Sequence, residues 1–327
     1  MNWKFWIGLL ISSTFLYITF HNVDLGLLYL STKSTSLPFI IPIVMLTVLF
    51  YLIRALRWFY LLKPIKKIGL SSLFSSTVIG FAANFVLPAR LGEFIRASYI
   101  GRMERISKSS SLATIVVERL FDVFTILLIL LFVILFTDFP SEWKTTGMAL
   151  KTGGFFLLII FIFAILLLVA LKEKTQNFLN ITENVVSFLP SKVKQKLVDV
   201  LKSFSNGLVL VKGPFQLLAV IFYSLTLWCL SAFQIYILGL SMGLSLTFLA
   251  PFFILTLLCL SVTIPSAPGY IGTFHIACQY GLMVYGFSPE KALSMAIVLH
   301  AAGFIPTVIL GLIIFLHQHI SLRNRTT

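Results

Sequence analysis

Charge is scarce in this sequence of 327 residues, and acidic charge is the scarcest. Only 11% of the residues are charged, with 11 Asp and Glu against 25 Lys and Arg, whereas 58% are hydrophobic. A soluble domain carries about 25% charged residues, so this composition excludes a soluble globular protein. Several apolar runs reach the roughly 20 residues that cross the hydrocarbon core of a bilayer. The sequence therefore predicts a polytopic membrane protein.

Cysteines and catalytic motifs are equally sparse. The three cysteines lie in apolar runs and form no CxxC pair, and their odd number argues against a disulfide framework. No group of His, Cys and carboxylate residues has metal-ligand spacing, and there is no P-loop, nucleophile elbow or dinucleotide-binding fingerprint. We therefore expect no enzyme activity, no metal and no cofactor. We attribute the net charge of +14 to membrane topology and lipid headgroups, and expect no nucleic-acid partner.

The apolar runs show no period-two alternation, which favours an all-α fold over transmembrane strands. Basic residues set the orientation, because 20 of the 25 Lys and Arg fall at position 4, in 54–108, in 172–213 and in the C-terminal tail. By the positive-inside rule these regions are cytoplasmic, which places both termini on the cytoplasmic side of the inner membrane. The runs lie at 3–20, 37–60, 71–88, 109–136, 152–171, 214–238, 248–264, 269–286 and 290–316.

Two apolar segments cannot be single membrane crossings. Residues 71–88 have basic, cytoplasmic flanks on both sides, and 248–286 has outer flanks on both sides by parity. Each predicts a re-entrant helical hairpin, the first turning near Asn84–Pro88 and the second near Pro265–Gly269. The prediction is therefore six full spans and two re-entrant hairpins.

These elements form a single membrane domain, 1–327, with two inverted repeats. Residues 1–136 form the first repeat and 152–316 the second, and interrupted helices in such repeats are typical of transporters. The second repeat includes residues 172–213, a basic amphipathic segment expected on the inner leaflet.

A short internal repeat supports this arrangement. Residues 88–94 read PARLGEF and residues 268–274 read PGYIGTF, and each falls at the turn of its hairpin. The alternative is two unrelated Pro/Gly turns. The turn residues predicted for the two hairpins are Pro88, Gly92, Pro265, Pro268, Gly269 and Gly272.

The first hairpin carries a cluster of polar residues, Asn84, Arg90, Glu93 and Arg96. A helix that begins after the turn would pair Glu93 with Arg96 at i,i+3 and would present free N–H groups to an anion. Two arginines beside such a terminus favour a phosphate. The alternative is a structural Arg–Glu clamp, with the arginines reaching for the interface.

A second cluster, in VVERLFDVF, contains Glu118, Arg119 and Asp122. Glu118 lies ten residues beyond Lys108, or about 15 Å into the membrane at 1.5 Å per residue. Arg119 can pair with Asp122 at i,i+3, and both carboxylates need partners at that depth. We therefore predict a salt-bridged network between this span and the first hairpin.

Other polar residues are interpreted as structural. Arg54 and Arg57 are assigned to the basic flank at the cytoplasmic end of the second span. His275 and His300 are single histidines in apolar runs, where a hydrogen-bonded packing role is favoured over a proton site.

Together these motifs resemble the lysylphosphatidylglycerol synthase transmembrane region, also called the flippase-like domain family, over nearly the whole chain. The most specific parts are N-x-x-x-P-x-R-x-G-E at 84–93 and E-R-x-x-D at 118–122. The resemblance implies lipid movement across the inner membrane. It points to substrate binding by Asn84, Arg90, Glu93, Arg96, Glu118, Arg119 and Asp122. We add His275 of the second hairpin as a further candidate for substrate binding.

The second hairpin departs from the family pattern, because Tyr270 stands for a Gly and His275 for an acidic residue. This departure puts a symmetric acidic pair in doubt. No aminoacyl-transferase domain follows the spans, so we do not carry over lysyl transfer.

We therefore expect a lipid translocase that moves an anionic phospholipid or a polyprenyl-phosphate-linked lipid through a polar cleft between the hairpins. Membrane lipids are the expected partners, and a homodimer is compatible with the sequence. The alternatives are a proton- or ion-coupled transporter of a small anion, and an accessory or scaffold subunit for envelope lipid or glycan synthesis.

Overall fold

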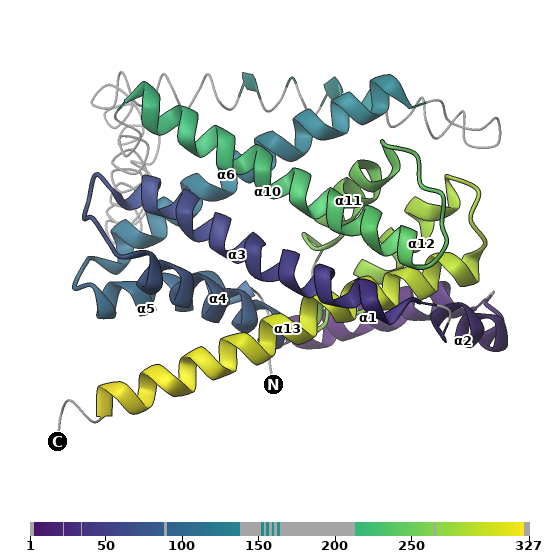
Figure 1. The fold of residues 1–327 in the computed structure, drawn as a ribbon, viewed down its shortest axis with the longest axis horizontal. Coiled ribbons are helices and arrows are strands. Elements are labelled where there is room, and N and C mark those ends of the chain that lie inside the picture. Colours follow the sequence, from purple (N-terminus) through teal and green to yellow (C-terminus); the bar gives the residue numbers. More distant parts are fainter. Residues whose placement is uncertain are drawn as a thin grey trace.

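The structure is a computed structural model that describes residues 3–21, 23–33, 35–87, 90–137, 213–264 and 266–323, with a few positions between 152 and 163. Over these ranges the chain is helical and contains no strand (Figure 1). The elements are α1 (Trp3–Phe20), α2 (Leu25–Lys33), η1 (Leu37–Phe39), α3 (Ile40–Leu62), α4 (Leu70–Val86), α5 (Gly92–Met103), α6 (Lys108–Phe136), α10 (Pro214–Ser241), α11 (Ala250–Ser261), η4 (Pro268–Tyr270), α12 (Thr273–Met283) and α13 (Pro289–Arg323).

Four of the described helices are long and apolar enough to span a membrane, namely α3, α6, α10 and α13. Their bounds agree with the predicted runs 37–60, 109–136, 214–238 and 290–316 to within a few residues, apart from the longer C-terminal end of α13. Three shorter apolar helices accompany them: α4, α11 and the part of α1 from Leu10 to Phe20. Most of the predicted span 152–171 and all but the last residue of the amphipathic segment 172–213 lie outside the described residues, so the count of six spans stays a prediction.

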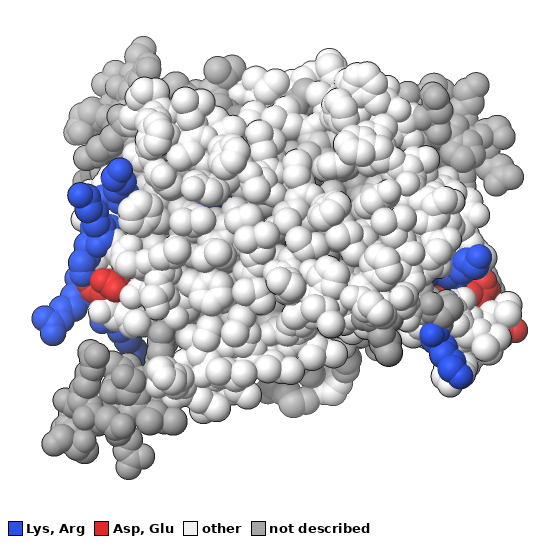
Figure 2. Space-filling model, viewed as in Figure 1, with Lys and Arg blue, Asp and Glu red and all other residues white. Residues whose placement is uncertain are grey.

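Exposed charged side chains gather at the two ends of the molecule's long axis, and the face between them in Figure 2 is bare of charge. Apolar side chains are widely exposed, among them Ile41, Met45 and Phe132, each more than half exposed. One end carries basic residues in the loops between α3 and α4 and between α5 and α6, where Lys66 binds Glu104 at 3.0 Å. The apolar zone has the form of a lipid-facing surface.

Two pairs of short helices lie at the positions of the predicted hairpins, and their re-entry into the membrane stays a prediction. Helix α4 packs against α5, and α11 packs against α12, each pair joined by a turn at the predicted position. At the first turn Asn84 Oδ1 accepts a hydrogen bond from the backbone N–H of Gly92 at 2.8 Å, so the α4 side chain satisfies the start of α5. Gly92 also sits against the carbonyl of Gly80, where a Cβ atom would overlap it.

Helix packing is the same in the two halves. The central helices α3 and α10 pack against each other. Helix α4 packs against α3, α5 and α13, and α11 packs in the same way against α10, α12 and α6. An inverted repeat requires this exchange of partners, and the division into repeats 1–136 and 152–316 stays a prediction.

Candidate functional site

Helix α6 places two carboxylates inside the molecule. Glu118 is fully buried and Asp122 is 5% exposed, and both accept hydrogen bonds from Arg54, as their i,i+4 spacing on one helix face allows. A buried carboxylate is costly unless it is paired. Each of the two therefore needs cations from neighbouring helices.

Helix α3 supplies two of these cations. Arg54 donates from Nη1 to Glu118 Oε1 at 2.8 Å and to Asp122 Oδ2 at 3.2 Å. Arg57 donates from Nη1 to Asp122 Oδ1 at 2.7 Å and to Ser224 Oγ at 2.9 Å, and its Nη2 lies 3.2 Å from Glu118 Oε1. Both arginines are essentially unexposed, so they are core residues and no part of an interfacial flank.

The third buried cation comes from the first hairpin. Arg96 of α5 donates from Nη1 to Glu118 Oε1 at 3.1 Å, with Nη2 3.0 Å from Oε2. Its guanidinium stacks on Trp58 at 3.8 Å from the ring centroid, and Trp58 Nε1 donates to Thr114 Oγ1 at 2.9 Å. Glu118 thus ties α3, α5 and α6 together.

A fourth arginine forms the partly exposed edge of the cluster. Arg119 Nη2 lies 2.7 Å from Glu93 Oε1, and Arg119 Nη1 donates to Asp122 Oδ2 at 3.1 Å. The side chains of Arg119 and Glu93 are 34% and 21% exposed, against 8% or less for the other five members. The cluster is therefore partly open to its surroundings at this pair.

The ion cluster, defined as Arg54, Arg57, Glu93, Arg96, Glu118, Arg119 and Asp122, carries one positive charge in excess. The Nε–H groups of its four arginines are buried and have no hydrogen-bond partner in the part of the chain described here. Buried donors without acceptors are costly, and an unmatched charge in an apolar setting more so. The cluster is therefore suited to an additional anion with several acceptor oxygens.

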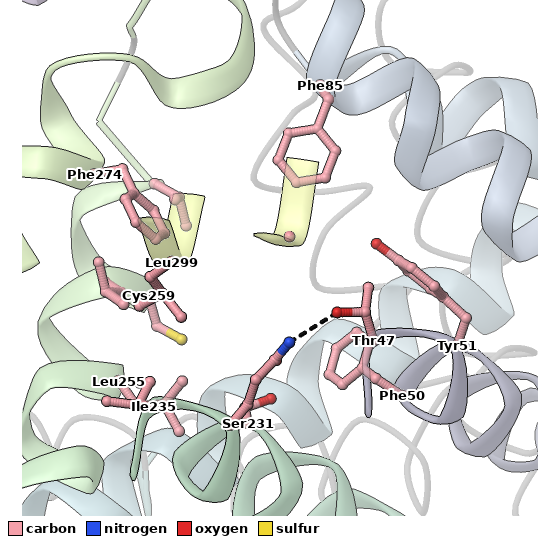
Figure 3. A pocket seen from close by; sticks show the side chains of 14 residues that line it. Thr47, Phe50, Tyr51, Phe85, Ser231, Ile235, Leu255, Cys259, Phe274 and Leu299 are labelled. Atoms are coloured by element: carbon pink, nitrogen blue, oxygen red, sulfur yellow. Dashed lines mark hydrogen bonds between the residues drawn. The ribbon is translucent and has the colours of Figure 1, made fainter. Parts of the chain in front are cut away.

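An apolar cavity of about 240 Å³ adjoins this cluster. Figure 3 shows Phe274 and Cys259 on one side of the cavity, Thr47 and Tyr51 across from them, and Phe85 between the two sides. Phe50, which also lines the cavity, lies 5.0 Å from the Arg54 guanidinium. The cavity therefore begins about one helical turn from the buried cations.

Polar side chains of the cavity wall form hydrogen bonds with one another and with Thr307, which lies outside the lining. Gln234 Nε2 donates to Thr47 Oγ1 at 2.8 Å, and the Tyr51 and Thr307 hydroxyls lie 2.8 Å apart. The remaining lining is mostly apolar. Such a wall suits hydrocarbon better than a hydrated ion.

His275 and His300 lie together beside the second hairpin turn. Their ring centroids are 4.9 Å apart, and His300 Nε2 lies 2.7 Å from the carbonyl oxygen of Gly269. The N–H of Gly272 donates to His275 Nδ1 at 3.4 Å. These contacts agree with the predicted packing role, and neither histidine is a member of the ion cluster.

The family model of the lysylphosphatidylglycerol synthase TM region matches residues 5–311 of this chain. The chain belongs to this family. The resemblance inferred from its motifs is therefore confirmed, over nearly the whole sequence.

The curated relatives of this family member are membrane proteins of archaea. A UPF0104 membrane protein of Methanocaldococcus jannaschii is 27% identical over 71% of this chain and 92% of its own. A second UPF0104 membrane protein from the same organism is 22% identical over 95% of this chain and 94% of its own. A UPF0104 membrane protein of Pyrococcus horikoshii is 24% identical over 84% of this chain and 87% of its own. No solved structure matches.

In this family member the structure brings most of the predicted site residues together. Glu118, Arg119 and Asp122 meet the hairpin residues Glu93 and Arg96, as the predicted network requires. The predicted Glu93–Arg96 pair is wrong, because Glu93 binds Arg119 and Arg96 binds Glu118. The packing of α5 against α6 gives Glu93 and Arg96 partners on α6 that are nearer than their i,i+3 neighbours.

Two further predictions need correction. Arg90 does not join Arg96 in the cluster, because its side chain turns away to the carbonyl oxygen of Val262, 2.6 Å distant. Arg54 and Arg57, assigned to the interface, are central members of the cluster. Their depth was a usable signal: Arg54 lies nine residues before Lys63, or about 13 Å along the helix.

The other predicted positions have structural places. Asn84 holds the start of α5, Gly269 has a positive φ of 76° and Gly272 one of 91° in the second turn. Pro268 begins η4. Pro88 and Pro265 lie outside the described residues, and substrate binding by any of these residues stays a prediction.

Proposed function

We propose that this chain is a lipid translocase of the flippase type, and not an enzyme. It would move an anionic or phosphate-bearing lipid across the cytoplasmic membrane between two re-entrant hairpins. The supporting observation is the ion cluster, whose excess positive charge is buried among apolar helices beside an apolar cavity. Ionisable residues at membrane depth are functional candidates by default.

Stability alone is a poor reason for such a cluster. Replacing a buried ion network by well-packed apolar side chains is often neutral or stabilising. Seven charged side chains with one charge unmatched therefore point to a task that needs charge. Arginine suits phosphate, because its planar donors match phosphate oxygens in pairs.

The partly exposed pair would receive the headgroup first. A phosphate that reaches Arg119 replaces Glu93 as its partner, and the excess charge of the cluster favours this exchange. The buried members, held by three helices, keep their positions and stabilise the anion electrostatically. The hydrocarbon chains stay in lipid or enter the adjoining cavity.

Phosphatidylglycerol and a polyprenyl phosphate present the same chemistry to this cluster, an anionic phosphate on a hydrocarbon anchor. Either is therefore a valid probe. The choice between them is an experimental outcome, because guanidinium recognition of the phosphate is common to both.

The test uses the full chain in proteoliposomes that contain fluorescent phosphatidylglycerol, or in parallel a labelled polyprenyl phosphate. A membrane-impermeant quencher added outside measures how fast the lipid exchanges between leaflets. We expect wild-type protein to accelerate exchange and the Arg119→Gln variant to lose at least 90% of that acceleration. The matched control, Lys66→Gln, alters an exposed ion pair at the end of the molecule and is expected to keep it.

Other outcomes refute parts of the proposal. If folded Arg119→Gln protein flips lipid as fast as the wild type, the ion cluster is not the headgroup site. If the wild type flips neither lipid but takes up radiolabelled inorganic phosphate, the protein is a transporter of a soluble anion. If it does neither, the translocase proposal fails and the accessory-subunit alternative gains support.

A further inference from the structure

The two copies of the internal repeat, PARLGEF and PGYIGTF, share a backbone conformation as well as a sequence pattern. Arg90 and Tyr270 occupy the third position of PARLGEF and PGYIGTF, and both have left-handed backbones, with φ of 53° and 59°. Residues other than glycine rarely adopt this conformation, which is strained and is found most often at ligand clamps and switch regions. Two equivalent hairpin tips thus carry the same strain.

The two strained residues also touch each other. The Arg90 guanidinium lies 5.7 Å from the Tyr270 ring centroid, and Arg90 Nη2 donates to the Val262 carbonyl oxygen at 2.6 Å. On the other side of the contact the Phe85 ring packs edge-on against Tyr270, at 6.0 Å, and Phe304, at 5.3 Å. The tips of the two hairpins are therefore joined by one cation and two aromatic rings, with Phe304 of α13 packed beside them.

This contact lies at the edge of the cavity, beside the hairpin tips. Phe85 and Val262, which hold Tyr270 and Arg90, are themselves lining residues of the cavity, and Figure 3 shows Phe85 at its wall. On its other side Tyr270 lies within electrostatic reach of Glu93 and Arg119, the partly exposed pair. A molecule that moves directly from that pair to the cavity would pass the tips.

We propose that Arg90 and Tyr270 form a latch that closes the cavity at the hairpin tips. The latch concerns access to the cavity, whatever molecule enters, and so goes beyond the proposed function. Opening separates the two tips, relieves their left-handed strain and leaves the Val262 carbonyl, at the end of α11, without the Arg90 donor. An incoming polar group can replace that donor, because backbone groups at membrane depth need a partner.

Native cysteines can report on the latch. Cys259 lines the cavity, and Cys278 is fully buried in the helix core. In a Cys229→Ser background, the full chain in proteoliposomes is treated with N-ethylmaleimide, and mass spectrometry follows the labelling of each remaining thiol. The test variant is Arg90→Gly, which removes the side chain and suits the positive φ.

The matched control is Arg105→Gly, because Arg105 is exposed, has the same φ of 53° and lies in the loop between α5 and α6, away from the tips. We expect Cys259 labelling at least tenfold faster in Arg90→Gly than in the wild type and within twofold of it in Arg105→Gly, with Cys278 unlabelled throughout. Tyr270→Gly is expected to match Arg90→Gly.

The proposal is overturned if Cys259 reacts at the wild-type rate in Arg90→Gly, or if Arg105→Gly accelerates it equally. It is also overturned if Cys278 becomes reactive in Arg90→Gly, since the tip contact would then maintain the fold and not close a cavity. None of these results depends on lipid exchange, so they are separable from a failure of the proposed translocase.

Discussion

Glu118 is the residue on which the ion cluster depends most. Its carboxylate has no exposed surface and lies 2.8, 3.2 and 3.0 Å from nitrogens of Arg54, Arg57 and Arg96. Glu118→Gln keeps the shape and removes the charge, so Arg54 and Arg57 would keep only Asp122 as a carboxylate partner and Arg96 would lose the carboxylate that it binds. Removing one member of a buried ion pair costs about 3–5 kcal/mol. We expect a loss of that size in the free energy of unfolding.

The measurement is reversible unfolding of the purified protein in mixed detergent micelles, followed by circular dichroism. The control is Glu104→Gln, whose partner Lys66 is 45% exposed and which should lose about 0–1 kcal/mol. Adding Arg96→Gln to Glu118→Gln returns the unmatched charge to one. The double variant should therefore lose at least about 1 kcal/mol less than the sum of the single losses. A Glu118→Gln loss below about 1 kcal/mol would refute this account of the cluster.

Two other predictions concern the first hairpin and the charged end. Gly92→Ala places a Cβ atom into the facing backbone of α4 and should lower the free energy of unfolding by about 1–3 kcal/mol. The control is Gly69→Ala, which has open space around it and should change that free energy by less than about 1 kcal/mol. Thermal unfolding measures both. A hydrogen bond from Ser72, and then Lys66, lower the pKa of Glu104. The stability that this carboxylate contributes should therefore be present at neutral pH and vanish as pH falls through its lowered pKa. The thermal midpoints of wild type and Glu104→Gln should converge in acid, and an unchanged difference between neutral and strongly acidic pH would contradict this.

Much of the architecture could be predicted from the sequence because lipid imposes simple rules. A span needs about 20 apolar residues, and the four long helices begin and end near the predicted runs. The hairpin turns were predictable because charge on both flanks forbids a single crossing. The Arg119–Asp122 pair followed from helix geometry, since residues three apart share a face.

The partners of the charged residues were less predictable. Hydropathy and loop charge locate a residue along the membrane normal. They do not distinguish an Arg54 at the interface from an Arg54 in the core. Only the packing of α3 against α6 decides that Arg54 binds Glu118. The same holds for Glu93, which binds an arginine 26 positions away in the chain instead of its neighbour Arg96.

By itself, then, the sequence determined a helical membrane protein of the lysylphosphatidylglycerol synthase TM region family, with interrupted helices at two repeated motifs. These properties follow from local composition and spacing. The tertiary structure decided which charges meet, how deeply they are buried, and that the two hairpin tips touch through Arg90 and Tyr270. Those contacts join residues up to 180 positions apart, and their energies depend on burial, which no local pattern encodes.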